Sequence, residues 1–124
     1  MIAIAKDFSQ DAVTKREILQ KDAIPESYLE NLLATLRTKG LLYTKRGVGG
    51  GYALTRVPSQ ITLLEIVEAL EGPLAPRDCI LNHSVCKKSQ NCFLRENWDA
   101  MYQAIRNTLG SVNLQQLVNK SREE

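Results

Sequence analysis

The chain has 124 residues, 44% of them hydrophobic, and a formal net charge of +2, which fits one globular domain or one domain with an arm. No segment has the roughly 18 consecutive apolar residues that a membrane span requires, and Met1–Ala5 is too short for a signal peptide, so we expect a cytoplasmic protein without a membrane partner. Residues 1–56 have nine Lys and Arg against six Asp and Glu, a mild basic excess that favours a nucleic-acid partner without requiring one.

Three short segments precede the first long helical pattern. Met1–Lys6 has a helical composition but no capping residue before it, so it resembles the end of a helix. Thr14–Glu17 has the spacing of a capping box and predicts a helix that continues to about Lys21. Asp22–Ile24 is then expected to form a turn.

The next helix is predicted from Pro25, at its first position, to about Lys39, with Gly40 as a stop. One face is apolar at helical spacing and consists of Leu29, Leu32, Leu33 and Leu36. The opposite face has Ser27, Asn31, Ala34 and Thr38, with Glu30 at its flank. Two short helices joined by a tight turn form a helix-turn-helix, whose second helix reads bases in the major groove.

A hairpin is predicted directly after this helix, with extended segments at residues 41–45 and 52–55. Its tip, Arg46–Gly51, has four glycines and is basic, which is typical of the wing of a winged helix. Lys45 and Arg46 are expected to contact phosphates, or Arg46 to enter the minor groove, while glycines such as Gly49 and Gly50 let the backbone approach DNA. The alternative is a mobile hairpin with solvated charges.

The polar face of the second helix is the predicted base-reading surface. Ser27 and Asn31 are short hydrogen-bonding residues, and Asn pairs well with adenine. Glu30 would accept from a cytosine amino group or exclude other sequences, because a carboxylate near DNA is unfavourable. The alternative is a solvated face with Glu30 favouring the helix dipole. The full set of candidate DNA contacts is Ser27, Tyr28, Glu30, Asn31, Lys45, Arg46, Gly49 and Gly50.

The second half of the chain contains three further helical patterns. Thr62–Glu65 is a second capping box after the connector at Pro58–Ile61, and its helix is expected to end at Gly72-Pro73, with Leu63, Ile66, Val67 and Leu70 inward. A long helix is predicted over Phe93–Leu109, and a short one follows with Leu114, Leu117 and Val118. The long helix has the apolar stripe Leu94, Trp98, Met101, Tyr102, Ile105 and Leu109. Such a stripe predicts burial against a second copy, and the alternative is folding back onto its own domain.

All three cysteines lie in the aperiodic segment between these helices, spaced Cys79-x6-Cys86-x5-Cys92. Clustered thiols in a reducing compartment favour metal or redox chemistry over disulfides. With His83 as a fourth ligand they would suit zinc or an iron–sulfur cluster. The alternatives are three free thiols and a solvated histidine. No nucleophile–base pair is evident, so we expect no enzyme.

The segments Ser27–Leu32, Leu36–Leu41 and Arg46–Tyr52, together with three cysteines ahead of a Trp-bearing helix, resemble the winged-helix regulators typified by the iron–sulfur cluster regulator IscR, a family that includes NsrR and CymR. The resemblance runs from Met1 to about Val118. It implies a dimer that binds operators through the helix-turn-helix and wing, with a 2Fe–2S or 4Fe–4S cluster in many members. It places Ser27, Glu30 and Asn31 at base-reading positions, Arg46 at the minor-groove arginine, and Cys79, Cys86 and Cys92 at the cluster thiolates.

The chain departs from that family in three places. Arg95 stands where IscR-like members have a histidine ligand, and a guanidinium cannot ligate. This leaves His83, Glu96, an acidic residue of the partner chain or a small molecule as the fourth ligand. The loop between the first two cysteines, Cys79 and Cys86, is one residue longer than in those members. Members of the family also usually have about a dozen more residues before the position of Met1.

We therefore predict a mainly α fold with a small β-hairpin wing, divided into a winged helix-turn-helix domain (1–72), a cysteine loop (73–92), and a dimerisation helix with a C-terminal helix (93–124). The predicted function is a homodimeric regulator of transcription, a repressor, that binds double-stranded DNA and senses redox, iron–sulfur or nitrosative status through a cluster. The alternatives are a cluster-free or zinc-bound regulator and a winged-helix module that binds protein.

Overall fold

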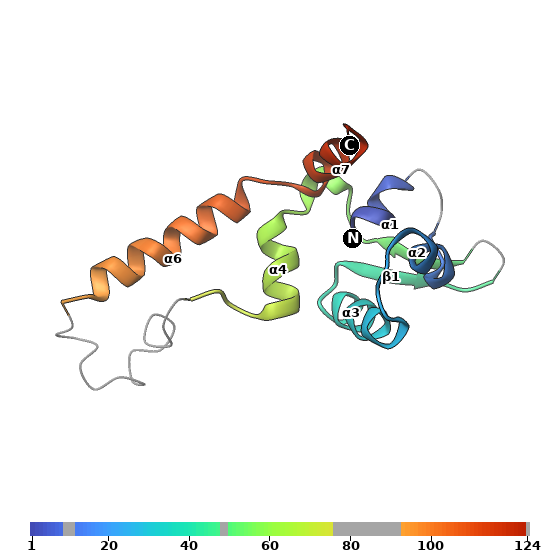
Figure 1. The fold of residues 1–124 in the computed structure, drawn as a ribbon, viewed down its shortest axis with the longest axis horizontal. Coiled ribbons are helices and arrows are strands. Elements are labelled where there is room, and N and C mark those ends of the chain that lie inside the picture. The colour runs from blue at the N-terminus through green and yellow to red at the C-terminus, as the bar shows by residue number, and fades with distance from the viewer. Residues whose placement is uncertain (9–11, 48–49, 76–92, 124) are drawn as a thin grey trace.

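The computed structural model describes residues 1–8, 12–47, 50–75 and 93–123 (Figure 1). The elements follow one another as α1 (Ile2–Lys6), α2 (Lys15–Lys21), α3 (Glu26–Thr38), β1 (Leu42–Lys45), β2 (Gly51–Leu54), the 3-10 turn η1 (Pro58–Gln60), α4 (Leu63–Glu71), α6 (Arg95–Gly110) and α7 (Leu114–Glu123). The mainly helical fold with a small hairpin wing is thus confirmed. No helix in these ranges is long and apolar enough to cross a membrane.

Local sequence signals fix the starts of α2 and α4. The Thr14 hydroxyl accepts from the Glu17 amide at 3.2 Å while the Glu17 carboxylate accepts from the Thr14 amide at 2.8 Å. Thr62 and Glu65 form the same reciprocal pair before α4, so both predicted capping boxes are confirmed. The sequence predicts Pro25 as the first residue of α3. In the structure the helix begins at Glu26, and Pro25 is its N-cap, with an extended ψ of 136°.

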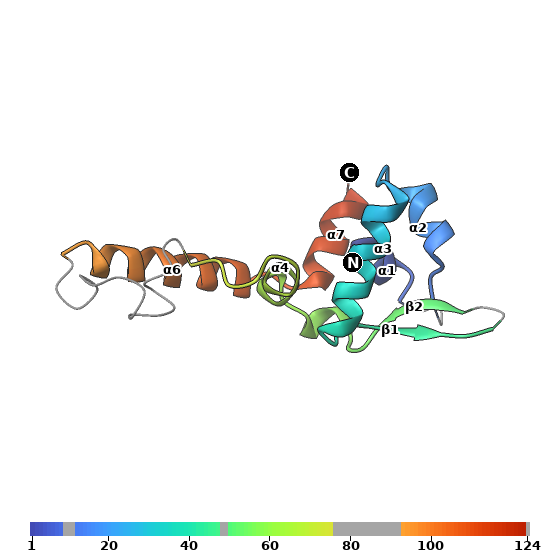
Figure 2. The ribbon, with the colours of Figure 1, turned by 90° about the horizontal axis from the view of Figure 1, so that it is seen from below.

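The wing is a two-stranded antiparallel sheet in which Leu42 pairs with Leu54 and Lys45 with Gly51. A third segment joins it, because Val13 and Tyr52 exchange two backbone hydrogen bonds of 2.9 and 2.7 Å. The residues just before α2 therefore hold the second strand of the wing. In Figure 2 the wing projects from the end of the molecule opposite α6.

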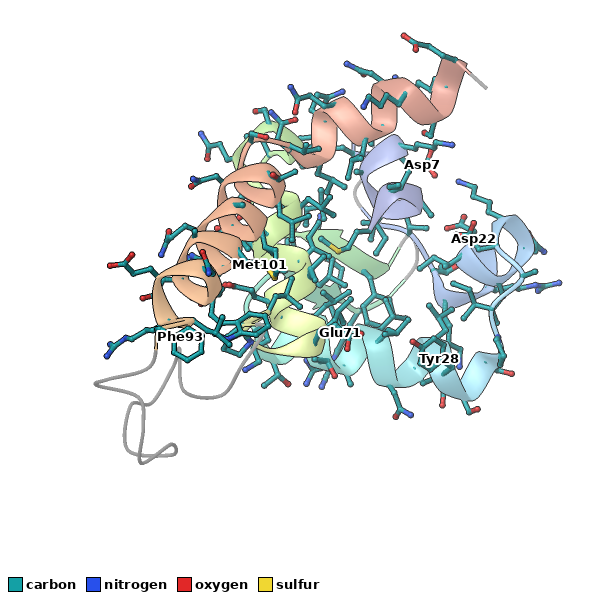
Figure 3. The ribbon with its side chains drawn as sticks, turned by 60° about the vertical axis from the view of Figure 1, so that its left-hand side comes forward. Asp7, Asp22, Tyr28, Glu71, Phe93 and Met101 are labelled. Carbon is teal, nitrogen blue, oxygen red and sulfur yellow. The ribbon has the colours of Figure 1, made fainter. Side chains whose placement is uncertain are left out.

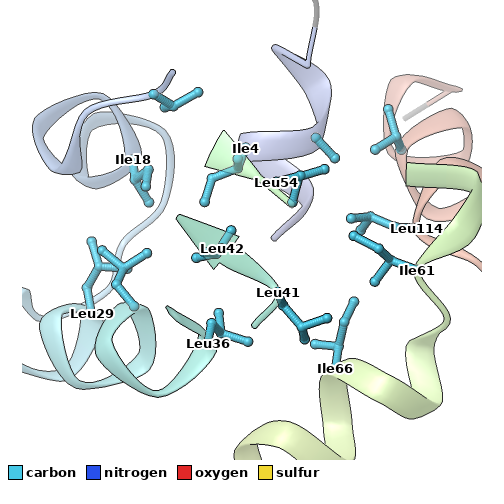
Figure 4. Close-up of a cluster of buried hydrophobic side chains, with 14 residues drawn as sticks. Ile4, Ile18, Leu29, Leu36, Leu41, Leu42, Leu54, Ile61, Ile66 and Leu114 are labelled. Atoms are coloured by element: carbon cyan, nitrogen blue, oxygen red, sulfur yellow. The ribbon is translucent and has the colours of Figure 1, made fainter. Parts of the chain in front are cut away.

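The hydrophobic core is assembled from both ends of the chain (Figure 4). Leu42, Ile61 and Leu114 are among its most deeply buried side chains. The full set of buried apolar residues is Ile4, Ala5, Val13, Ile18, Leu29, Leu33, Leu36, Leu41, Leu42, Leu54, Ile61, Ile66, Leu114 and Val118. The apolar face of α3 is buried as expected, except that Leu32 is only half-buried.

The final helix, α7, packs into the core of the winged unit. The sequence-based division grouped this helix with the dimerisation helix in residues 93–124, and that division stays a prediction. Leu114 and Val118 nevertheless lie in the same core as Leu42, and the Leu114 amide donates to the Ile61 carbonyl at 2.8 Å. The end of the described chain thus helps to hold the helix-turn-helix and the wing together.

Helix α6 extends from this core as an arm, and α4 lies between it and the winged unit (Figures 1 and 2). Of the side chains predicted to point inward from α4, only Ile66 is buried, while Leu63, Val67 and Leu70 are half-buried. The Arg106 guanidinium of α6 donates to the Glu68 carboxylate of α4 at 2.6 Å and lies 5.7 Å from the centre of the Tyr102 ring. This ion pair holds the two helices in contact. No residue of α6 is buried in the single chain.

We expect Leu114→Ala to destabilise the winged unit, although Leu114 lies far from it in sequence. Truncating a fully buried leucine should lower the free energy of unfolding by about 2–5 kcal/mol, measured by urea denaturation. Lys120→Ala, on the exposed side of the same helix, should change it by less than about 0.5 kcal/mol. Equal small losses in both variants would mean that α7 does not stabilise this core.

Candidate nucleic-acid interface

The outer face of α3 carries the predicted base-reading residues on the side away from the core. Ser27, Glu30 and Asn31 are all exposed, because Leu29, Leu33 and Leu36 turn the opposite face inward. Tyr28 is 56% exposed and lies at the other end of the view from Phe93 in Figure 3. The structure thus brings four of the predicted DNA contacts onto one exposed helix.

Two threonines on α3 are tied to their own helix. The Thr35 hydroxyl donates to the Asn31 carbonyl and the Thr38 hydroxyl donates to the Ala34 carbonyl, both at 2.9 Å. Their hydroxyl protons are therefore used locally. The side chains of Glu26, Ser27, Glu30 and Asn31 are the exposed polar and charged groups of the first two turns.

Glu30 is held by a lysine from the neighbouring helix. The Lys15 ammonium, in the first turn of α2, lies 2.7 Å from a Glu30 oxygen and 3.0 Å from a Glu26 oxygen. The hydrogen bonds that Lys15 donates to Glu30 and Glu26 raise the pKa of Lys15 above its ordinary value of 10.5, so it stays charged at neutral pH. The negative charge of Glu30 is therefore partly compensated before any DNA arrives.

Sequence reasoning missed Lys15. The capping box predicted its place at the start of α2, but nothing local indicates that it reaches across the turn to α3. A lysine at that position is usually only a solvated residue of a first turn. The contact depends on the angle between two helices, which the shared core determines.

The tip of the wing presents Arg46 to solvent directly after β1. Lys45 is half-buried, as the last residue of the strand and the partner of Gly51. Gly47 has a φ of +92°, and the Gly50 amide donates to its carbonyl at 3.0 Å, which closes the described part of the turn. Gly49 lies outside the described residues.

The protein itself requires glycine at two positions of the tip. A Cβ on Gly50 would lie 2.5 Å from the Lys45 carbonyl oxygen, and a Cβ on Gly51 would lie 2.4 Å from the Val13 carbonyl oxygen. Gly51 also has a φ of +139°. The sequence alone left the glycines open to two explanations, a positive φ or close approach to DNA, and at these two positions the backbone of the wing itself excludes a side chain.

The predicted ligands Cys79, His83, Cys86 and Cys92 lie outside the described residues. Within residues 1–8, 12–47, 50–75 and 93–123, no three His, Cys, Asp or Glu side chains gather as a metal site. Arg95 and Glu96 lie in the first turn of α6, and Glu96 is exposed. As a donor set, three thiols within residues 79–92 suit an iron–sulfur cluster or zinc.

Comparison with known proteins places this architecture in a family. Residues 1–120 match the family described as Rrf2, iron-dependent transcriptional regulator. The transcriptional regulator CymR of Bacillus subtilis is 33% identical over 119 residues, covering 96% of this chain and 81% of that protein. The regulator IscR of Xenorhabdus nematophila is 30% identical, covering 95% of this chain and 71% of that protein.

Solved structures agree with the sequence relatives. The structure of B. subtilis CymR, described as the global cysteine regulator, matches with a TM-score of 0.76 at 31% identity, covering 96% of this chain and 87% of that one. T. potens IscR matches with a TM-score of 0.73 at 30% identity, covering 98% and 80%. The chain belongs to the Rrf2 family of DNA-binding transcriptional regulators, whose named members here are regulators and not enzymes.

We expect Gly51→Ala to loosen the wing more than Gly47→Ala. Both place a side chain at positive φ, which costs about 1–2 kcal/mol, but only at Gly51 would the new Cβ also collide with the Val13 backbone, while Gly47 has nothing within 4 Å. Denaturant unfolding should therefore show a larger decrease in the free energy of unfolding for G51A than for G47A. An equal loss in the two variants would contradict the close packing of Val13 on the wing.

Proposed function

We propose that this Rrf2-family chain acts as a homodimeric repressor whose cysteine segment responds to redox, iron–sulfur or nitrosative status. Helix α3 enters the major groove and the wing lies against the flanking minor groove. The observation that supports this most directly is the exposed polar face of α3 beside a wing with an exposed arginine at its tip. The DNA-reading unit consists of residues 1–72, the sensing segment of residues 73–92, and the dimerisation region of residues 93–124. Helix α7, in the last of these, also supports the DNA-reading unit.

Individual roles follow from side-chain chemistry. Asn31 suits adenine, Ser27 can donate or accept, and Glu30 can accept from a cytosine amino group. Tyr28, at the exposed edge of α3, and Lys45 contact the backbone of the DNA. Arg46 enters the minor groove or pairs with a phosphate, since a narrow minor groove concentrates negative potential. Gly49 and Gly50 keep the tip thin enough for close approach.

The long helix provides the dimer contact. Met101 is 49% exposed and Phe93 is 89% exposed, and both are labelled on the outer arm in Figure 3. Trp98, Tyr102 and Ile105 are no more than half-buried, although they belong to the same apolar stripe. A second copy packed along α6 would cover this stripe, and two-fold symmetry suits proteins that read paired half-sites.

The sensing segment is bounded by two helices that are already connected. It begins after α4 (Leu63–Glu71) and ends before α6 (Arg95–Gly110), and the Arg106–Glu68 ion pair joins these helices. The Leu63 amide also donates to the Val112 carbonyl at 2.8 Å, which ties the base of α4 to the end of α6. A change between α4 and α6 would therefore alter how two recognition helices are spaced across a dimer.

Cys79, Cys86 and Cys92 would hold the cluster, and the fourth ligand is His83, Glu96, a partner residue or a small molecule. A bound 2Fe–2S or 4Fe–4S cluster supplies redox chemistry that thiols alone do not. There are two alternatives to an iron–sulfur cluster. In one the cysteines bind zinc, and in the other the thiols are oxidised directly. The second is favoured by the relationship to CymR, because a Staphylococcus aureus CymR structure, 27% identical to this chain, is described as an oxidized form.

We expect Arg46→Ala to weaken binding to duplex operator DNA by about 10-fold and to reduce the slope of log K against log salt by about 0.9, as loss of one phosphate contact does. Fluorescence anisotropy at several salt concentrations measures both quantities. Lys120→Ala removes the same charge from α7, outside α3 and the wing, and should leave binding nearly unchanged. Wild-type affinity in R46A would argue against a DNA-contacting wing.

We expect protein purified without oxygen to absorb visible light and to contain iron, and Cys79→Ala, Cys86→Ala or Cys92→Ala to remove both signals. His83→Ala tests the fourth position, because retained iron would exclude that side chain as a necessary ligand. Elemental analysis separates zinc from iron. Colourless protein without iron after careful reconstitution would contradict the cluster and leave the DNA-binding function intact.

A further inference from the structure

The contact between Lys15 and two glutamates of α3 joins the two helices of the helix-turn-helix. Glu26 and Glu30 are four residues apart, so their side chains stand one above the other on the same side of α3. The Lys15 ammonium lies between them at 3.0 and 2.7 Å. The Lys15 side chain is 34% exposed and that of Glu30 is 53% exposed, so the pair remains open to a molecule that approaches α3.

We propose that Lys15 is a specificity-determining residue, which positions the Glu30 carboxylate of α3 for reading one base pair. This inference rests on the proposed role of Glu30 as a base-reading residue. Lys15 itself need not touch DNA, since it acts through the carboxylate to which it donates. The ligand is therefore the base edge that Glu30 accepts from, a cytosine amino group in the major groove.

Two physical effects follow from this contact. A glutamate side chain has several rotamers, and a hydrogen bond that fixes one of them before binding reduces the ordering required in the complex. Lys15 also compensates a negative charge that would otherwise face the phosphates. Because water leaves the groove on binding, the compensation becomes more important in the complex than in the free protein.

A variant of Glu26 separates two possible effects of Lys15, the positioning of the Glu30 side chain and the simple compensation of negative charge on α3. Lys15 has a longer contact to Glu26 than to Glu30, and Glu26 lies in the first turn of α3, where a carboxylate also favours the helix dipole. Removing the Glu26 charge leaves the Lys15–Glu30 hydrogen bond in place. Discrimination between bases should therefore survive in Glu26→Gln and fail in Lys15→Met.

The test measures affinity for a set of duplexes that differ from the selected operator by one base pair at a time. The base pair read by Glu30 is the one at which Glu30→Ala loses discrimination. We expect Lys15→Met to lower the preference at that same base pair by about 3- to 10-fold, in the range of couplings between contacting residues. Lys15→Arg should restore much of it, and Lys120→Met should change nothing.

A double-mutant cycle decides the mechanism. If Lys15 acts through Glu30, Lys15→Met should have no effect on base preference when Glu30 is already Ala. A uniform loss of affinity for every duplex, with a salt slope reduced by about 1 and unchanged in the Glu30→Ala background, would show a phosphate contact instead and overturn the proposal.

The proposed base contact of Glu30 and the proposed role of Lys15 are tested separately. If Glu30→Ala changes discrimination at no base pair, Glu30 does not read DNA, and the proposed base contact and the role of Lys15 both fall. If Glu30→Ala changes discrimination but Lys15→Met does not, only the role of Lys15 falls. Thermal unfolding of each variant, followed by circular dichroism, confirms that the proteins compared are folded.

Discussion

The proposed DNA-binding surface depends on one small hydrophobic core that lies beneath α3 and the wing. Leu36 from α3, Leu42 and Leu54 from the wing, and Leu114 from α7 are buried in the same cluster. Because β1 follows α3 almost directly, the helix and the hairpin cannot rotate independently without disturbing that cluster. The exposed polar face of α3 and the basic tip of the wing are thus presented together, as a base-reading helix and a flanking arm require.

Polar contacts at the edge of the core refine this arrangement. Val13 lies against Gly51 and Tyr52, so the chain before α2 stiffens the wing at the point where its tip begins. Lys15, two residues later, reaches Glu30 on α3. One short segment therefore touches both parts of the proposed DNA surface. At the other end of the unit, the Glu68–Arg106 pair fastens α6 to α4 and so to the core.

Sequence patterns were sufficient where the cause of structure is local. The capping boxes at Thr14 and Thr62 and the leucine stripe of α3 each act within a few residues, and the structure has them as predicted. The packing of α7 on the core and the contact of Lys15 with Glu30 each join residues that are distant in sequence. No hydrophobic periodicity or motif spacing predicts contacts of this kind. The glycines of the wing were ambiguous for the same reason, since the Val13 backbone that excludes a side chain at Gly51 lies 38 positions earlier.

In the proposed function, two such units, paired through α6, read one operator together. Hydroxyl-radical footprinting of the protein on an operator selected from genomic fragments tests this most directly. We expect two protected half-sites separated by one helical turn, about 10 base pairs, or a multiple of it, with protection extending into each flanking minor groove. A single protected half-site, or protection that does not depend on sequence, would contradict it.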